Sequence, residues 1–101
     1  MRIIVLFNLK PGVSVVSYEQ WARDSDIPGV RALKSVSSYH VQRATGILGS
    51  DQPSPYAYIE IIEIADMAQF GEEAAGPVVQ ALAADMRNYA DDPVFITTDD
   101  L

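Results

Sequence analysis

The chain has 101 residues, of which 49% are hydrophobic and 21% are charged, and it contains no cysteine. This composition is typical of one globular domain, and it excludes disulfides, zinc–thiolate sites, iron–sulfur clusters and thiol catalysis. The net charge of −7 argues against a nucleic-acid or membrane partner, since both surfaces attract clustered Lys and Arg. The apolar start lacks the length and cleavage site of an export signal. We therefore expect a single cytoplasmic domain over residues 1–101.

Charge is divided unevenly along the sequence. Residues 1–50 hold six basic and three acidic residues, whereas residues 51–101 hold eleven acidic residues and one basic residue, Arg87. One interpretation is a solvated acidic face. The other is that basic and acidic surfaces face each other between elements or subunits, and the sequence leaves both open.

The first half of the chain predicts a strand, a helix and a second strand. Residues 3–9 form a continuous apolar run, typical of a central strand covered on both faces. A capping-box spacing predicts a helix over 17–25, ended by Ile27-Pro28-Gly29 because the residue before proline disfavours the helical conformation. Residues 33–45 are rich in Val, Tyr, Thr and Ser and predict a long, half-exposed strand.

A loop and a clearly alternating strand follow. Residues 46–55 contain two Gly and two Pro and form a candidate lid or pocket rim. Residues 56–64 alternate, with Ala57, Ile59 and Ile61 on one face. We expect that face to receive the helices.

Two helices and a last strand complete the chain. Asp66 is a plausible N-cap for a helix that reaches about residue 74. Gly76-Pro77 interrupts the pattern, and a second helix is predicted over 77–89. The last strand is predicted over 94–98.

The order strand, helix, strand, strand, helix, strand predicts an α+β, ferredoxin-like βαββαβ sandwich with both helices on one face of a four-stranded antiparallel sheet. The other face would remain apolar, and a second copy of the sheet is the simplest cover. We therefore expect a homodimer, in which strands that curve toward each other enclose a cavity between sheet and helices.

Three segments carry a resemblance to a known family. They are the opening strand and turn, the Tyr18-x-x-Trp21 helix with the turn that follows it, and the strand pair formed by residues 35–43 and 55–63. The sequence resembles the dimeric α/β-barrel superfamily and, within it, the REDY-like (HapK-like) proteins of prodigiosin-type pathways. The resemblance implies a homodimer without metal, flavin or haem that acts on a small aromatic or pyrrolic intermediate. Relatives include cofactor-free monooxygenases, polyketide cyclases and decarboxylases, so the fold leaves the reaction open.

Polar residues on the predicted strands are candidates for catalysis. Tyr58 and Glu60 share the face opposite Ile59, so we expect them to look into the cavity. If Val41 joins the helix side, His40 points into the cavity as well. His40 is the only histidine and the leading candidate for a general acid or base, and Glu60 could pass a proton or pair with it.

Four further residues are candidates for substrate binding: Asn8, which could donate a hydrogen bond to an oxyanion, and Trp21, Tyr39 and Arg43. Each candidate also has a structural interpretation. His40 could be half in solvent, Glu60 could pair at the surface with Arg43 or Lys34, and Asn8 could cap a turn. The tyrosines and Trp21 could be core or amphipathic strand residues.

Other chemistries have no motif here. One histidine cannot form a multi-histidine metal site within one subunit, and we expect no metal and no cofactor. There is no phosphate-binding glycine loop and no Gly-x-Ser-x-Gly elbow. The sequence therefore supports two hypotheses. One is a cofactor-independent enzyme that uses acid/base catalysis for condensation, cyclisation or dehydration. The other is a non-catalytic dimer that binds or carries such an intermediate.

Overall fold

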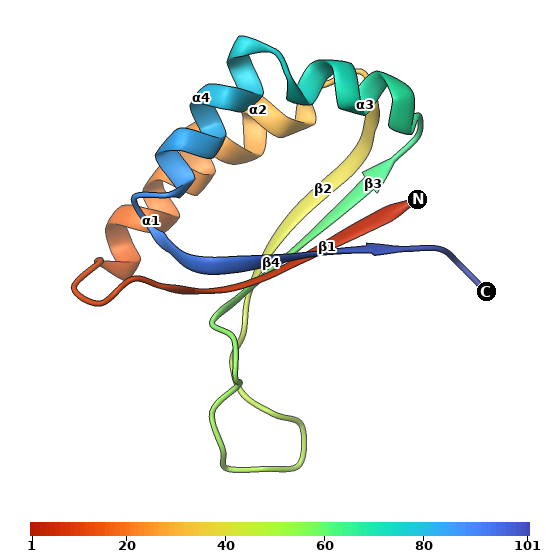
Figure 1. The fold of residues 1–101 in the computed structure, drawn as a ribbon. Helices are drawn as coiled ribbons and strands as arrows, with labels where there is room; N and C mark the ends of the chain where they lie inside the picture. Colours follow the sequence, from red (N-terminus) through yellow and green to blue (C-terminus); the bar gives the residue numbers. More distant parts are fainter.

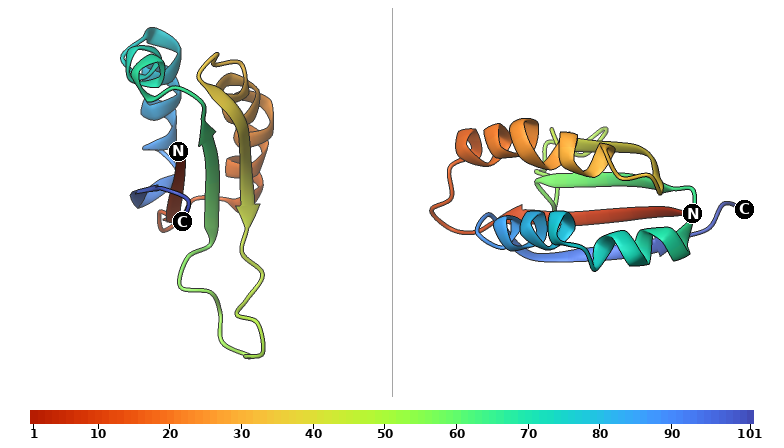
Figure 2. Two further views of the ribbon diagram at one scale, coloured as in Figure 1. Left: turned by 90° about the vertical axis from the view of Figure 1, so that its right-hand side faces the viewer. Right: turned by 90° about the horizontal axis from the view of Figure 1, so that it is seen from above.

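A computed structural model describes residues 1–101 and places four strands in one antiparallel sheet of order β2-β3-β1-β4. The strands are β1 (Arg2–Leu9), β2 (Val36–Arg43), β3 (Tyr58–Ile64) and β4 (Ala90–Thr98). All helices lie on one face of this sheet (Figures 1 and 2). The predicted ferredoxin-like arrangement is confirmed, and β1 is a central strand as expected.

The helical layer has two parts. The first runs through α1 (Val15–Trp21), the π-helical turn η1 (Ala22–Asp26) and α2 (Ile27–Arg31). The second consists of α3 (Met67–Ala74) and α4 (Pro77–Met86), which lie side by side with the first part when the molecule is seen from above (Figure 2). None of these helices has the length and hydrophobicity needed to cross a bilayer.

The first helix begins earlier and ends later than the sequence predicts. Ser14 is its N-cap, because the Ser14 hydroxyl accepts a hydrogen bond from the Ser17 N–H at 3.2 Å. The chain also stays helical through Pro28, so the predicted end at that residue is wrong. The reason is the wide turn of η1, in which the Ile27 N–H bonds the Ala22 carbonyl five residues back. Pro28 then lies in the first turn of α2, where its missing N–H costs little.

The remaining strands and helices follow the predicted order, but some of them differ from the prediction in length. β2 is shorter than the predicted strand over 33–45, and β4 begins at Ala90 instead of residue 94. The predicted N-cap of α3 is confirmed, since an Asp66 carboxylate oxygen accepts the Gln69 N–H at 3.1 Å. The break at Gly76-Pro77 is confirmed as well.

The two faces of β3 are reversed relative to the prediction. Tyr58, Glu60 and Ile62 are buried beneath the helices, while Ile59 and Ile61 lie on the open face of the sheet. Aromatic packing explains this choice: the Tyr58 ring lies 5.5 Å from the Phe7 ring and 4.7 Å from the Tyr18 ring. Burying these large rings outweighs burying the isoleucines of the other face.

The loop between β2 and β3 projects away from the helices, on the far side of β1 and β4 (Figure 1). Its base is held by Asn8, whose side-chain amide donates to the Pro55 carbonyl at 3.1 Å and accepts the Ala57 N–H at 2.9 Å. Leu48 near its tip is fully exposed. The loop therefore does not cover the space between helices and sheet, as a lid over that space would.

Candidate active site

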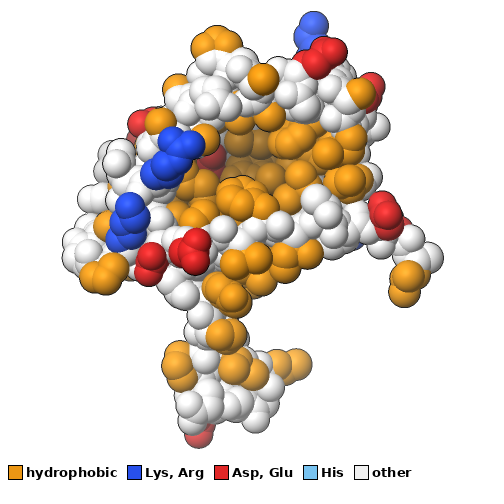
Figure 3. Space-filling view, viewed as in Figure 1, with side chains coloured by type: hydrophobic (Ala, Val, Ile, Leu, Met, Phe, Trp, Pro, Cys, Tyr) orange, Lys and Arg blue, Asp and Glu red, His pale blue; other side chains and the backbone are white.

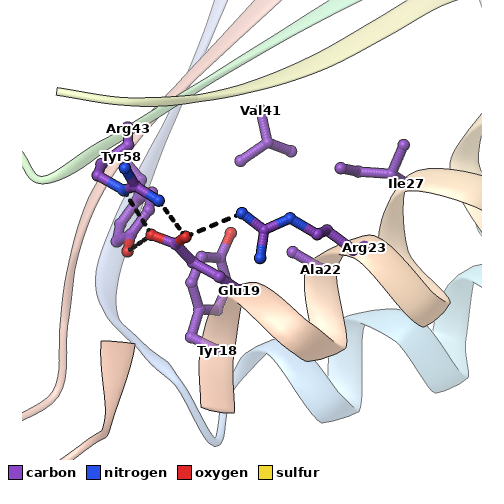
Figure 4. A pocket seen from close by; sticks show the side chains of 8 residues that line it. All are labelled: Tyr18, Glu19, Ala22, Arg23, Ile27, Val41, Arg43 and Tyr58. Atoms are coloured by element: carbon purple, nitrogen blue, oxygen red, sulfur yellow. Dashed lines mark hydrogen bonds and ion pairs between the residues drawn. The ribbon is translucent and has the colours of Figure 1, made fainter. Parts of the chain in front are cut away.

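A cavity of about 250 Å³ lies between the first helical segment and the β2–β3 edge of the sheet (Figure 4). Its walls come from α1, η1 and the start of α2 on one side and from the strands on the other. The residues that line it are Tyr18, Glu19, Ala22, Arg23, Ile27, Val41, Arg43 and Tyr58.

Glu19 is the hub of the polar groups at the mouth of this cavity. Its carboxylate accepts hydrogen bonds from the Arg43 guanidinium, from the Tyr58 hydroxyl at 2.7 Å and from Arg23 at 3.2 Å (Figure 4). The hydrogen bonds from Arg43 and then from Tyr58 lower the pKa of Glu19 to about 2. Glu19 is therefore a fixed anion, and the network joins α1 to the ends of β2 and β3.

A second polar group lies deeper beneath the helices. The buried Tyr39 hydroxyl donates to the Asp26 carboxylate at 2.7 Å. Burial raises the pKa of Asp26, and burial followed by the charge of Glu60 raises the pKa of Tyr39 above its ordinary value. Burial also raises the pKa of Tyr18, whose hydroxyl has no hydrogen-bond partner. Both phenols are neutral hydrogen-bond donors near pH 7.

Glu60 lies beneath the cavity and is not one of the residues that line it. It is on the same face of β3 as Tyr58 and directly opposite Val41 of β2, and both of these residues line the cavity. Only 3% of Glu60 is exposed, and its Oε2 atom has no hydrogen-bond partner. Burial, and then the nearby Asp26, raise the pKa of Glu60 to about 8. A carboxyl group of this kind is mostly protonated at neutral pH and can both donate and accept a proton.

Aromatic rings surround these polar groups. Tyr18 contacts the rings of Phe7, Trp21, Tyr58 and Tyr89, and Trp21 stacks on Tyr89 at 5.2 Å. Trp21 is the only tryptophan and is half-buried. It is part of the core next to the cavity and does not line it.

The structure separates the predicted site residues into two groups. Tyr58, Glu60, Tyr39 and Arg43 are on the helix side of the sheet, whereas His40 is directly opposite Ile61 and lies exposed on the open face. His40 and Glu60 therefore point to opposite sides of the sheet, and the prediction that they pair within one chain is wrong. Val41 does face the helices, as assumed in the sequence analysis. Tyr58 and Glu60 face the helices as well, because the two faces of β3 are the reverse of the prediction.

The structure also decides between the interpretations given above for Arg43, Lys34 and Asn8. Arg43 pairs with Glu19 instead of Glu60. The Lys34 and Ser35 N–H groups are bound by the Glu73 carboxylate at 2.9 Å each. Asn8 caps the base of the loop, which is the structural interpretation considered for it.

Sequence reasoning missed Glu19, Asp26 and Tyr18 as polar parts of the site. A signal for Asp26 was present: it follows Tyr18 and Ala22 at intervals of four residues, and all three are buried on the same stripe of the first helical segment. A charged residue on an apolar helical stripe indicates a buried carboxyl group that needs a partner.

No cluster of three or more His, Cys, Asp or Glu side chains suited to a metal ion occurs in the structure. The ionisable groups of the interior are two carboxyls and several phenols. This set favours proton transfer and hydrogen bonding to a small molecule.

Residues 1–101 match the family model described as REDY-like protein HapK. The chain belongs to the HapK (REDY-like) family. A search of curated proteins returned no match.

Solved structures share the fold of this HapK-family chain. HapK from Hahella chejuensis has 24% sequence identity and a TM-score of 0.73, over 97% of this chain and 92% of that one. A dimeric ferredoxin-like protein of unknown function from Thermobifida fusca has 20% identity and a TM-score of 0.71, over 94% and 85%. A hydroxynitrile lyase from Passiflora edulis has 15% identity and a TM-score of 0.77, over 94% and 87%.

The protonation of Glu60 predicts how stability changes with pH. The pKa of Glu60 is about 8 in the folded protein, and 4.5 is the value for the unfolded chain. Between pH 4.5 and pH 8 the unfolded chain therefore releases a proton that the folded chain keeps. The contribution of Glu60 to the free energy of unfolding should therefore be full below about pH 4.5. It should fall as pH rises to 8, by at most about 1.4 kcal/mol per pH unit.

Urea unfolding at pH 5 to 8 measures this slope. Glu60→Gln should reduce it and raise stability at pH 8, because the amide stays neutral, while the part of the slope due to Asp26 should remain. Glu72→Gln, at an exposed position on α3, should keep the wild-type slope. An unchanged slope in Glu60→Gln would show that Glu60 is ionised in the folded protein.

Proposed function

We propose that this protein is an enzyme that works without a cofactor, by acid/base catalysis, on a small aromatic or pyrrole-type intermediate held between the helices and the sheet. The observation that carries the proposal is Glu60, a buried carboxyl group with a raised pKa and an oxygen atom without a protein partner. Buried polar atoms of native proteins are nearly always hydrogen-bonded, and strongly shifted pKa values cluster at functional sites.

The surrounding groups suit a planar, uncharged molecule. The cavity walls combine aromatic and aliphatic side chains with neutral phenols, so a ring can pack against Tyr18 and Val41 while its polar group meets a hydrogen-bond donor. The charge of Glu19 at the mouth is already paired with Arg23 and Arg43, so it does not select for or against an anion. The carboxyls of Asp26 and Glu60 lie beneath the cavity, and a negative charge placed above them would be disfavoured. The proposed substrate is therefore neutral in the part that enters.

A dehydration illustrates the proposed chemistry. The step requires the substrate's hydroxyl group to pass between Val41 and Tyr58 and reach Glu60, which lies beneath these lining residues. Protonated Glu60 then gives its proton to that hydroxyl group, the carbon–oxygen bond breaks and water leaves. The resulting carboxylate then removes a proton from the neighbouring carbon or nitrogen, a double bond forms, and Glu60 returns to its acid form. Condensation and cyclisation need the same pair of proton transfers at a carbonyl oxygen and an adjacent carbon.

Membership of the HapK family supports a role in secondary metabolism of the prodigiosin type, and we include this setting in the proposal. The fold is also that of a protein named as a hydroxynitrile lyase, so the same architecture occurs in an enzyme. In this assignment Glu60 replaces His40 as the acid/base group, since His40 lies on the other side of the sheet. Tyr58, Tyr39 and Arg43 act through the hydrogen bonds that position the cavity walls.

The competing function is a dimer that binds such a molecule and releases it unchanged. The aromatic cluster beside the cavity favours it, because stacked rings bind a planar ligand whether or not a proton moves. The two functions share a binding site and differ only in whether a product forms.

We also propose that the protein is a homodimer that packs through the open face of the sheet. That face presents a row of half-buried or exposed aliphatic side chains, Ile4, Leu6, Ile59, Ile61, Val94 and Ile96. Such a surface is larger and more contiguous than the scattered apolar residues of a monomer surface. The fold neighbour from Thermobifida fusca is described as dimeric.

The enzymatic proposal predicts a loss of turnover in one variant. Pyrrole aldehydes, pyrrole alcohols and phenolic ketones are incubated with the protein and followed by mass spectrometry. A mass shift that requires the wild-type protein should fall by about 100-fold or more in Glu60→Gln, because an amide cannot transfer the proton. His40→Gln should retain turnover.

Binding is followed in the same samples by the fluorescence of Trp21, which packs beside the cavity. Quenching by these compounds without any product would favour the binding dimer. Full turnover in Glu60→Gln, or its loss in His40→Gln, would contradict the assignment of Glu60.

The dimer predicts a change in mass when the open face is charged. Sedimentation equilibrium at micromolar concentration should give twice the chain mass for the wild type. Ile61→Asp should give a folded monomer, because dimerisation would then bury an unpaired carboxylate in an apolar interface. Val78→Asp, at an exposed position of α4, should remain dimeric. A folded wild-type monomer under these conditions would overturn the proposal.

A further inference from the structure

A second hollow lies at the opposite edge of the molecule, between the end of α4 and β4. Its volume is about 390 Å³, and its apolar wall includes Ala83, Met86 and Phe95. Figure 3 shows hydrophobic side chains within the hollowed face between the helices and the sheet, with basic and acidic side chains together at one rim. Phe95 shares the helix-facing side of the sheet with buried Val5, yet 60% of it is exposed.

This hollow is open because the helices above it bury little. Neither α3 nor α4 contributes a fully buried residue, whereas Tyr18, Ala22 and Asp26 of the first helical segment are buried. The apolar residues on the underside of α4 therefore form a roof over an accessible space of the size that binds small ligands.

Two of the three basic side chains without a partner are in the wall of this hollow. Arg2, Arg23 and Arg43 form ion pairs, and Arg31 donates to the Tyr39 carbonyl. The side chains of Lys10, Lys34 and Arg87 make no ion pair or hydrogen bond, and of these three only Lys10 and Arg87 line the hollow. Arg87 is also the only basic residue in the second half of the chain.

Backbone geometry brings these two cations together. Lys10 follows β1 and Arg87 follows α4, and the Lys10 N–H donates to the Tyr89 carbonyl at 2.8 Å. One carboxylate, Asp92, also lines the hollow. Among the residues that line the hollow, two cations therefore face one anion, on a protein whose net charge is −7.

We propose that this hollow binds an amphipathic organic monoanion, such as an aromatic carboxylate or sulfonate. Its apolar body packs against Met86 and Phe95, and its acid group lies between Lys10 and Arg87. Asp92 and the acidic second half of the chain disfavour phosphates and other polyanions, which carry more charge than the two cations neutralise.

The inference is independent of the proposed function. The hollow shares no lining residue with the cavity beside Glu19, and Glu60 lines neither of them. Failure of one proposal therefore leaves the other intact, and Glu60→Gln should bind the monoanion as the wild type does.

A pair of fluorescent probes tests the proposal. 8-Anilino-1-naphthalenesulfonate carries the anion, and N-phenyl-1-naphthylamine has the same rings without it. At low ionic strength, the Lys10→Gln/Arg87→Gln variant should weaken binding of the sulfonate by about tenfold, since hydrogen bonds to charged groups are lost. Binding of the neutral probe should be unchanged.

Two further variants make the result specific to this hollow. Arg2→Gln/Lys34→Gln removes the same charge elsewhere and should leave the Kd of both probes unchanged. Phe95→Asp, at an exposed position, should weaken both probes. The proposal is overturned if the wild type binds no sulfonate, if the two double variants weaken it equally, or if Phe95→Asp leaves both probes bound.

Discussion

The structure depends on which side of β3 is covered by helices. Packing of Tyr58 against Phe7 and Tyr18 fixes that side, and the two-residue period of a strand then carries Glu60 beneath the helices with it. The Glu60 carboxyl group is therefore buried in an apolar interior because Tyr58, two residues before it, packs against aromatic rings. Its neutral form is favoured there, which gives the protein a proton donor and acceptor near neutral pH.

The same sheet separates three surfaces with different chemistry. The face of the sheet that the helices cover holds the buried carboxyls and phenols near β2 and β3. The open face holds a row of aliphatic residues that no other element of the chain covers. The β4 edge holds an apolar hollow with two unpaired cations. Each surface follows from strand alternation and from where the helices lie, and the three proposals can therefore be tested separately.

The element order, the strand pairs and the Asp66 cap could be predicted because each depends on local patterns of turns, caps and alternation. The facing of β3 could not. Both of its faces are apolar, since Ile59 and Ile61 alternate with Tyr58 and Ile62, and hydrophobicity alone does not say which face meets the helices. For this reason the sequence pattern predicts His40 and Glu60 on the same side of the sheet, whereas the structure has them on opposite sides. The passage of the helix through Pro28 was also hidden, because it depends on a π-helical turn that has no clear sequence signal.

The most direct test of this account is the protonation of Glu60 itself. A carbon-detected NMR titration of the glutamate side-chain carboxyls, with Glu60 assigned by its disappearance in Glu60→Gln, follows each group separately. The account predicts one resonance with a midpoint near pH 8, as burial of Glu60 requires. A Glu60 midpoint at the ordinary value of a solvent-exposed glutamate would contradict it, and the acid/base role proposed for this carboxyl would then be lost.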